Sequence, residues 1–223
     1  VVFTLGSMLA GDLSAKFLHQ EQPEKLAAYE WHFDTESHAD LVLFGSLDEK
    51  TQEVNGAIKI PGLLSFLADN NTNTEVKGLD EFPKDLQPPM IVHYYFDLMV
   101  SMGVFCLVVS GAYVLTLIFK EQRKFTHSKP MLYGALLTGP AAMLAIEFGW
   151  FLTEQGRQPW IVRGYLKVAD AATQAGGLTL VTILFGLLYL VLIVTSAYVL
   201  IRMFKEKPAY KEVEALASER GDA

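Results

Sequence analysis

Charged and apolar residues are sharply segregated along the chain. Three apolar stretches are long enough to cross a membrane as helices, at about residues 90–119, at about 131–153 and within 171–201. The third is 31 residues long and carries no charge, and the second contains one acid, Glu147. A helix that rises about 1.5 Å per residue covers a hydrocarbon core of roughly 30 Å in each case. The pattern predicts an all-α, multi-pass membrane protein with three complete transmembrane helices.

The first ten residues, 1–10, are also almost wholly apolar. They are too short to span a bilayer, which takes about 20 residues. They also lack the basic flank and the cleavage site of a signal peptide. We interpret them as the end of a fourth transmembrane helix, and the chain as a fragment of a longer protein.

Basic residues orient the spans, because positive charge marks the cytoplasmic side. They occupy the loop after the first complete span and the tail after the third, which places both on the same side if the helices alternate. Residues 12–87, with fifteen acids and six bases, then face outward. The predicted division is a truncated helix at 1–11, an extracytoplasmic loop at 12–87, a helix at 88–120, a cytoplasmic loop at 121–129, a helix at 130–154, an outer loop at 155–176, a helix at 177–204 and a cytoplasmic tail at 205–223.

The outer segment has its own local signals. Pro23 begins a helix that we expect to continue to Phe33. Residues 41–44 and 57–60 are expected to pair as a hairpin, with Asn55 and Gly56 at the turn. Residues 63–67 form a short amphipathic piece that could lie on the membrane surface, and an Asn-rich loop at 69–74 follows.

Composition adds little to this picture. The chain is 51% hydrophobic with a formal net charge of −7. Its single cysteine, Cys106, excludes an intrachain disulfide. The sequence contains no internal repeat and no nucleic-acid-binding signature.

The second complete span carries a polar stripe. At 100° per residue Met143, Glu147, Trp150 and Glu154 fall on one face of the helix. A carboxylate inside a membrane costs about 2.5 kcal/mol or more unless it is paired, protonated or bound to a metal. Glu154 near the membrane edge is equally compatible with a simple ion pair to Arg157, but Glu147 lies about two turns deeper and indicates a functional site.

Residues 149–160, which read GWFLTEQGRQPW, resemble the GWxxxExGRQPW signature of subunit I of the cytochrome bd oxidases. The resemblance implies that Glu154 is the axial ligand of the high-spin heme b595, which lies beside heme d. It places Trp150 between the hemes and Arg157 beside a heme propionate or the Glu154 carboxylate. Glu147 also matches an acid of the family, for which we expect a heme contact or a place on a proton path.

In residues 93–103, Met99 stands where the family has the methionine ligand of its low-spin heme b558. A methionine in an apolar helix is by itself core packing far more often than a ligand, so only the resemblance singles it out. Asp97 departs from the family pattern, in which many members have an arginine at this position. Asp97 lies one helical turn after His93, which makes a contact between these two side chains possible.

Residues 11–14 and 22–30 resemble the start of the family's quinol-binding loop, in a short form, so the resemblance implies that the extracytoplasmic loop at 12–87 is a quinol-binding loop. Lys25 and Glu30 match the lysine and glutamate implicated there in quinol binding and oxidation. They lie about 140° apart on a helix, too far for a surface pair, but they could flank one ligand. Quinol releases two protons with its two electrons, so Glu30 could act as a base and Lys25 could bind a quinone oxygen. Without the resemblance both would be ordinary solvated charges.

The resemblance implies a heme-binding quinol oxidase in the cytoplasmic membrane of a bacterium or archaeon. Electrons from quinol would pass through the b hemes to heme d, where O2 is reduced to water and a proton motive force results. Expected partners are membrane lipid, a second membrane subunit (subunit II) and a small single-helix subunit, with no nucleic acid. The chain's five histidines do not match the family's heme-ligating histidines, so we expect the fragment alone to be inactive.

Two alternatives remain from the residues themselves. A membrane ion or solute transporter would use Glu147 and Glu154 as intramembrane acids. A heme-free relative would serve only as a structural partner. An optical spectrum separates both from a heme protein.

Overall fold

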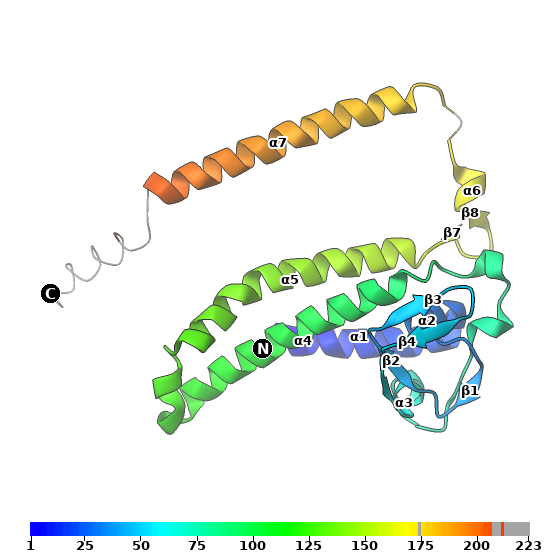
Figure 1. Ribbon diagram of the computed structural model, residues 1–223, viewed down its shortest axis with the longest axis horizontal. Coiled ribbons are helices and arrows are strands. Elements are labelled where there is room, and N and C mark those ends of the chain that lie inside the picture. The colour runs from blue at the N-terminus through cyan, green and yellow to red at the C-terminus, as the bar shows by residue number, and fades with distance from the viewer. Residues whose placement is uncertain (174, 207–210, 212–223) are drawn as a thin grey trace. The chain divides into compact units, whose positions relative to one another are not determined.

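The computed structural model describes residues 1–173, 175–206 and 211 (Figure 1). The chain divides into two compact units, Val1–Ala171 and the part that starts at Ala172. Among the described residues, the first unit contains the outer segment, named for its predicted location, and three helices of 20 residues or more, and the second contains one such helix.

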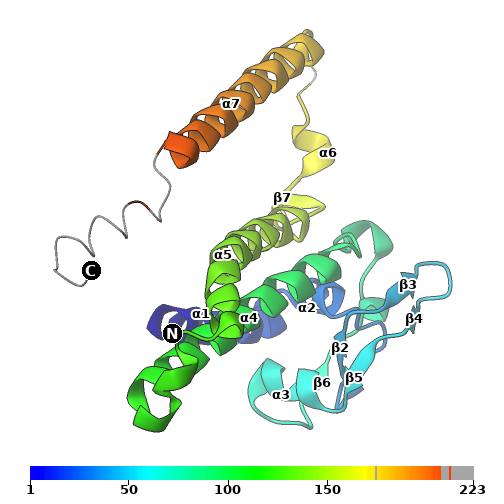
Figure 2. The same ribbon diagram turned by 60° about the vertical axis from the view of Figure 1, so that its left-hand side comes forward.

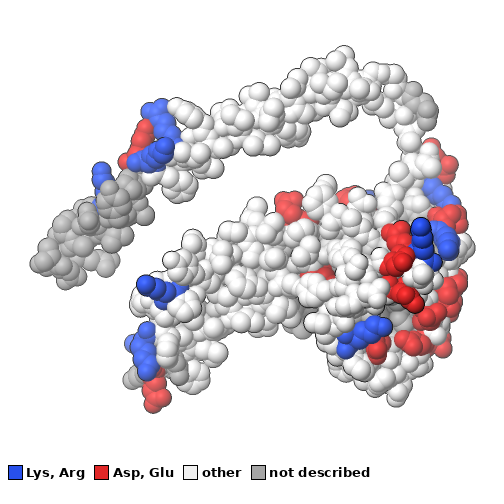
Figure 3. Space-filling model, in the orientation of Figure 1, with Lys and Arg blue, Asp and Glu red and all other residues white. Residues whose placement is uncertain are grey.

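Three helices in the described part of the chain have the length and hydropathy of membrane spans, as the apolar stretches predict. They are α4 (Val92–Ile118), α5 (Lys129–Gln155) and α7 (Leu178–Glu206). In the first unit α4 and α5 pack along each other, and their visible surface is mostly uncharged, with a few acidic patches along it and a group of mostly basic side chains at its far end (Figure 3). The second unit holds α7, on which no described residue is buried.

The first helix is longer than the sequence predicts. Helix α1 runs from Val2 to Glu21, about ten residues beyond the expected boundary at Gly11. It ends at Gln22, whose φ of −140° is extended, because the residue before a proline is forced out of the helical region. The polar residues that look like the start of a loop, such as Asp12 and Lys16, instead form an i,i+4 ion pair on the helix.

Helix α2 (Pro23–Tyr29) is short because Trp31 takes a positive φ of 47° and turns the chain, so the helix does not continue to Phe33 as expected. Figure 2 shows α2 between the strands of the outer segment and α4. Its residues enter two apolar clusters. Leu26 packs against the outer segment with Leu41 and Leu64. Residues 27–29 pack with Leu79, Val92 and Leu152, so this cluster joins the outer segment to α4 and α5.

The strands of the outer segment pair as small two-stranded sheets. The predicted pairing of residues 41–44 with 57–60 is confirmed, with Leu41 opposite Ile60. The predicted turn at Asn55–Gly56 is wrong, because the chain inserts a second antiparallel pair between these strands and turns at residues 49–52. The strands are β1 (Glu36–Ser37) with β6 (Glu75–Val76), β2 (Leu41–Leu43) with β5 (Ile58–Ile60), and β3 (Ser46–Asp48) with β4 (Glu53–Asn55).

Helix α3 (Leu63–Asp69) corresponds to the expected amphipathic piece. Leu64 and Ala68 are buried in the core of the outer segment itself. The buried hydroxyl of Ser65 accepts the N–H of Ala39 at 2.8 Å and donates to the carbonyl of Thr74 at 2.7 Å. These contacts fix α3 to both ends of the strand region.

The remaining elements connect the spans. Single 3₁₀ turns at Leu79–Glu81 and Lys84–Leu86 lead into α4, and a 3₁₀ segment of two turns at Lys120–Phe125 connects α4 to α5. After α5 the chain forms a hairpin of β7 (Trp160–Val162) and β8 (Leu166–Lys167), followed by the one-turn helix α6 (Val168–Ala171). This hairpin lies beside α2 and, with it, forms the site described next.

Candidate functional site

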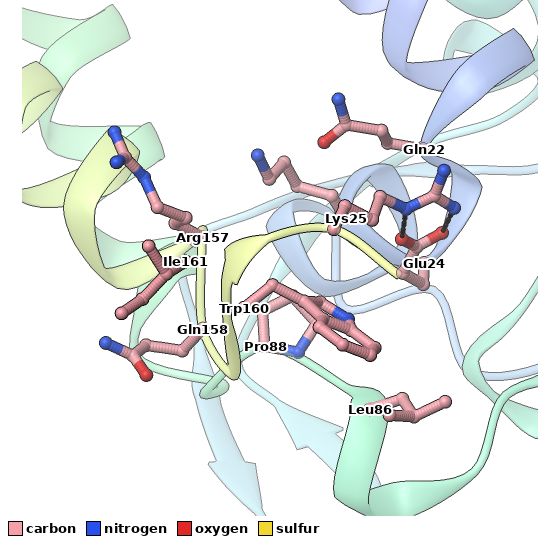
Figure 4. A pocket seen from close by; sticks show the side chains of 11 residues that line it. Gln22, Glu24, Lys25, Leu86, Pro88, Arg157, Gln158, Trp160 and Ile161 are labelled. Carbon is pink, nitrogen blue, oxygen red and sulfur yellow. Dashed lines mark hydrogen bonds and ion pairs between the residues drawn. The ribbon is translucent and has the colours of Figure 1, made fainter. Parts of the chain in front are cut away.

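A cavity of about 200 Å³ lies between α2 and the segment that follows α5 (Figure 4). Lys25 on α2 and Arg157 and Trp160 in the GRQPW segment contribute to its wall. Its volume suits a single ring-sized group, because cavities for whole drug-sized ligands are about 300 Å³ or more. The residues that line it are Gln22, Glu24, Lys25, Leu86, Pro88, Gly156, Arg157, Gln158, Trp160, Ile161 and Arg163.

Lys25 supplies the amine of this cavity. Its side chain extends away from Glu24, toward Gln22 and Arg157 (Figure 4). Burial lowers the pKa of Lys25; Glu24 opposes this effect, and the positive charges of Arg157 and Arg163 add to it. Within the described part of the chain Lys25 forms no ion pair. Its ammonium group is therefore free to donate hydrogen bonds to a ligand.

Glu24 is held by Arg163 from the hairpin. Arg163 Nε donates to Glu24 Oε1 at 2.7 Å, and the Nη2 group donates to Oε2 at 2.9 Å. The Nη1 group also donates to the carbonyl of Glu21 at 2.6 Å. The side chain of Glu24 is almost buried, which makes this two-point contact a close, charge-assisted link between α2 and the hairpin.

Glu30 follows α2 and does not line the cavity. It is 3% exposed, and burial together with the charge of Asp97 raises its pKa to about 8. Its Oε2 atom has no hydrogen-bond partner among the described residues. The structure therefore does not place Lys25 and Glu30 around one ligand, because the cavity opens beside Lys25 while Glu30 is enclosed.

Asp97 and His93 form a buried pair on the first turns of α4. His93 Nε2 lies 3.2 Å from Asp97 Oδ2, so the contact that the i,i+4 spacing makes possible is formed. His93 Nδ1 lies 2.7 Å from the carbonyl oxygen of Tyr29, and the imidazole stacks on Trp31 with ring centroids 4.0 Å apart. The pair thus connects α4 to the chain immediately before and after Glu30.

Asp97 also holds the turn between β2 and β3. Its Oδ2 accepts the N–H of Phe44 at 2.6 Å. Phe44 has a φ of 57° and Gly45 a φ of 106°, a sharp turn in which Gly45 also lies too close to Ala57 to carry a side chain. Asp97 therefore fastens the strand region to the span that carries Met99.

The polar stripe of α5 faces away from the packed core of this chain. Met143, Glu147 and Trp150 are all exposed, with 56% of Trp150 accessible. Glu154 follows on the same face, with its side chain 46% exposed. The structure leaves this face open for a large group or for other helices to cover.

Arg157 lies 3.7 Å from Glu154, between Nη2 and Oε1. Both side chains are about half exposed, so the pair contributes little to stability. Glu154 keeps an oxygen lone pair available, and a carboxylate is a suitable hard donor for an iron ion. Arg157 reaches both this carboxylate and the cavity, which connects the two parts of the site.

Met99 packs at the junction of α4 and α5. It lies against the apolar cluster of residues 27–29 and Leu152. A Cβ atom placed on Gly149 would lie 3.1 Å from Met99 Sδ, so the first glycine of the GW signature gives the thioether its space. A half-buried thioether is a soft donor compatible with heme iron. Among residues 1–173, 175–206 and 211, no three His, Cys, Asp or Glu side chains gather as a metal site.

A second glycine of the signature also has a steric role. A side chain at Gly156 would overlap the hydroxyl of Tyr29 and lie 2.7 Å from the carbonyl oxygen of Leu152. Tyr29 donates to that carbonyl at 3.4 Å, and burial raises the pKa of Tyr29 to about 12. The glycine allows α2 to pack directly on the end of α5.

The fold and the site define a multi-pass membrane protein with a charged cavity and buried acids at one end of the pair α4 and α5. Residues 1–208 match the family model for cytochrome bd terminal oxidase subunit I, and the chain belongs to this family. The alternatives of a transporter or a heme-free relative gain no support from this match.

Individual relatives agree with the family. The chain is 36% identical over 218 residues to a putative cytochrome bd menaquinol oxidase subunit I of Bacillus subtilis (strain 168), covering 97% of this chain and 48% of the relative. It is 32% identical over 217 residues to a cytochrome bd ubiquinol oxidase subunit 1 of the same organism, covering 91% and 46%. The structure of a bd oxidase from Geobacillus thermodenitrificans matches with a TM-score of 0.79 and 50% identity, over 93% of this chain and 47% of that one. The chain spans about half the length of these relatives.

Sequence reasoning missed the partners that complete the site. Arg163 and Glu24 are 139 positions apart, and no local pattern connects them. Trp160 belongs to the signature, but its position in the cavity wall follows only from the fold. The i,i+4 spacing of His93 and Asp97 was the one available signal, and it indicated the pair but not its contact with the strands.

Proposed function

We propose that this chain is part of a heme-binding subunit of a quinol:oxygen oxidoreductase and that the cavity beside Lys25 binds the quinol head group. The observation that carries the proposal is the position of the cavity. It is lined by the start of the predicted quinol-binding loop and by the GRQPW segment, directly after the helix that carries Glu154. A quinol bound here lies at the predicted outer face.

In the cavity Lys25 donates a hydrogen bond to a quinol oxygen, and the indole of Trp160 provides an apolar wall for the ring. Quinol oxidation releases two protons and two electrons. Glu30, whose pKa burial raises to about 8, is the proposed proton relay: it is mainly protonated at neutral pH, so it first releases its own proton outward and then accepts one that leaves the cavity, without contacting the ligand directly. Proton release on this side and oxygen reduction with cytoplasmic protons would generate a proton motive force.

The proposed heme ligands are Met99 for heme b558 and Glu154 for heme b595, with heme d nearby in the complete protein. When bound, these hemes supply the electron transfer from quinol to O2. Arg157 balances the charge of a propionate or of Glu154, Trp150 contacts the porphyrins from the open face of α5, and Glu147 lies in a heme contact or on a proton path. Subunit II, a small single-helix subunit and lipid would cover the apolar surface, in a bacterial or archaeal cytoplasmic membrane with residues 12–87 outside.

A reduced-minus-oxidised optical spectrum of the assembled oxidase tests the heme assignment. Met99→Leu should remove the low-spin heme b signal and Glu154→Ala the high-spin heme b signal, with the other signal retained in each case. Met102→Leu, one helical turn from Met99, is the matched control and should leave both signals. A spectrum unchanged by Met99→Leu and Glu154→Ala would contradict the proposed ligands.

Steady-state quinol oxidation by the same preparation tests the cavity. Lys25→Met should raise the KM for quinol by about tenfold or more, the value of one charge-assisted hydrogen bond. Lys16→Met, on the preceding helix and outside the cavity, should leave KM unchanged. If Lys25→Met also has no effect on KM, the quinol binds elsewhere.

A further inference from the structure

Three charged side chains of α2 and the hairpin lie together at the cavity, and only one is available to a ligand. Arg163 occupies both oxygens of Glu24. Lys25, adjacent to Glu24 in the chain, has no such partner among the described residues and extends into the cavity. Within the described residues, the Lys25 ammonium group is therefore unpaired while Arg163 engages Glu24.

Glu24 would compete for Lys25 if Arg163 were absent. A nearly buried carboxylate without a partner is strongly unfavourable, so it recruits the nearest cation. Lys25 is the adjacent residue, and Glu24 is the strongest of the charges acting on it. Neighbouring helical residues point in different directions, but the flexible four-carbon stem of a lysine can turn toward the next side chain.

We propose that Arg163 is a positioning residue for quinol binding, which engages Glu24 and thereby leaves the Lys25 ammonium free for the quinol oxygen. The inference rests on the proposed quinol site at Lys25. It gives the hairpin after α5 a role in substrate affinity that neither the signature nor the heme assignment contains.

The guanidinium fork is suited to this task. Its two parallel N–H donors match the two oxygens of one carboxylate, and its third contact with the carbonyl of Glu21 fixes the plane of the pair at the end of α1. A lysine at 163 could satisfy one oxygen only. The second oxygen of Glu24 would then remain available to Lys25.

A double-variant cycle in the assembled oxidase tests the role of Arg163. Arg163→Gln should raise the quinol KM about tenfold with little change in kcat, because Lys25 turns to Glu24. Adding Glu24→Gln should return KM to within about twofold of wild type, because no acid then competes for Lys25. Arg163→Lys should give an intermediate KM.

If the Arg163–Glu24 ion pair only fastens the hairpin to α2, adding Glu24→Gln should not lower the KM, because the ion pair is lost in the double variant too. A double variant as impaired as Arg163→Gln would overturn the proposal, as would an unchanged KM in Arg163→Gln. If the Arg163→Gln oxidase fails to assemble its hemes, the single variant Glu24→Gln decides. A KM near wild type supports the proposal, because Lys25 stays free when the acid is removed. A raised KM contradicts it, because the ion pair then serves only to hold the hairpin in place.

Two further variants separate this inference from the proposed function. Asp85→Asn removes the exposed ion pair between Asp85 and Lys167, which also connects the hairpin to the outer segment, and should leave KM unchanged. Lys25→Met reports on the quinol site itself. An effect of Lys25→Met without an effect of Arg163→Gln defeats only the role of Arg163, whereas no effect of Lys25→Met defeats the site.

Discussion

On the cavity side of α2 the buried acid Glu24 is held by an arginine, whereas on the side toward α4 the buried acid Glu30 has a second acid, Asp97, as its charged neighbour. The arginine stabilises the charge of Glu24 at both oxygens. Glu30 lacks such a partner, and its raised pKa keeps it mainly protonated at neutral pH. One seven-residue helix thus separates a site built on paired charges from a site in which an acid is kept neutral by burial.

The largest expected effect that tests this contrast is the pH dependence that Glu30 gives to the folding stability of the outer segment. Its folded-state pKa of about 8 is above the ordinary value of 4.5, so its contribution to stability is complete below about pH 4.5 and is lost as pH rises toward 8. The loss reaches at most about 5 kcal/mol at 1.36 kcal/mol per unit. Glu30→Gln should flatten this dependence, as measured by the proteolysis rate of the outer segment at pH 5, 6.5 and 8.

Exposed Glu36→Gln is the control for Glu30→Gln and should retain the wild-type pH profile. If the wild-type outer segment is proteolysed at the same rate at all three pH values, Glu30 is not a buried acid with a raised pKa. The contrast between the two sides of α2 would then disappear.

Asp97→Ala should give the next largest effect. It leaves the buried N–H of Phe44 without its acceptor and removes the carboxylate that contacts His93, at about 1–3 kcal/mol for the unsatisfied donor. The free energy of local opening of residues 41–48 should fall by this amount in hydrogen exchange. Asp97→Asn keeps an acceptor oxygen and should lose less than half as much; equal losses would show that the charge, rather than the hydrogen bond, holds the turn.

Gly156→Ala tests how closely α2 must pack on α5. The added methyl group overlaps the Tyr29 hydroxyl and approaches the backbone oxygen of Leu152, at about 1–3 kcal/mol for an overpacked contact. We expect lower thermal stability of the oxidase, and Tyr29→Phe in the same background should recover part of it. Unchanged stability in Gly156→Ala would show that the helix ends adjust freely. Gly139→Ala is the control, because a side chain at Gly139 meets open space in this chain, and it should leave the thermal stability unchanged. Gly164→Ala is unsuitable because a φ of 76° strains any residue with a side chain.

The smallest effect is expected for Lys167→Gln. The ion pair of Lys167 with Asp85 at 3.0 Å is exposed, so its loss should change the thermal midpoint by less than the equivalent of about 1 kcal/mol. If the thermal midpoint falls as far as in Arg163→Gln, the exposed Lys167–Asp85 pair and the nearly buried Arg163–Glu24 pair hold the hairpin equally. Burial of Glu24 would then not explain the difference between the two sides of α2.

The sequence alone was sufficient for the three spans and for the residues of the signature. A run such as 178–206 has only one stable form in lipid, because its backbone must satisfy its own hydrogen bonds. The family resemblance pointed to Lys25 and Glu30, but their positions on opposite sides of α2 depend on tertiary packing. The end of α1 was misjudged because Asp12 and Lys16 look like a loop while they pair on a helix. The strand pair at 46–55 was missed because a turn signal at Asn55–Gly56 suggested a shorter hairpin.

The contact between Met99 and Gly149 has a consequence for electron transfer. Gly149 precedes Glu154 by five residues on α5, and Met99 is on α4, so the two proposed iron ligands belong to helices in direct van der Waals contact. If both positions hold hemes, no flexible loop separates the two redox centres. Their tunnelling distance would stay constant while the outer segment exchanges one substrate molecule for the next.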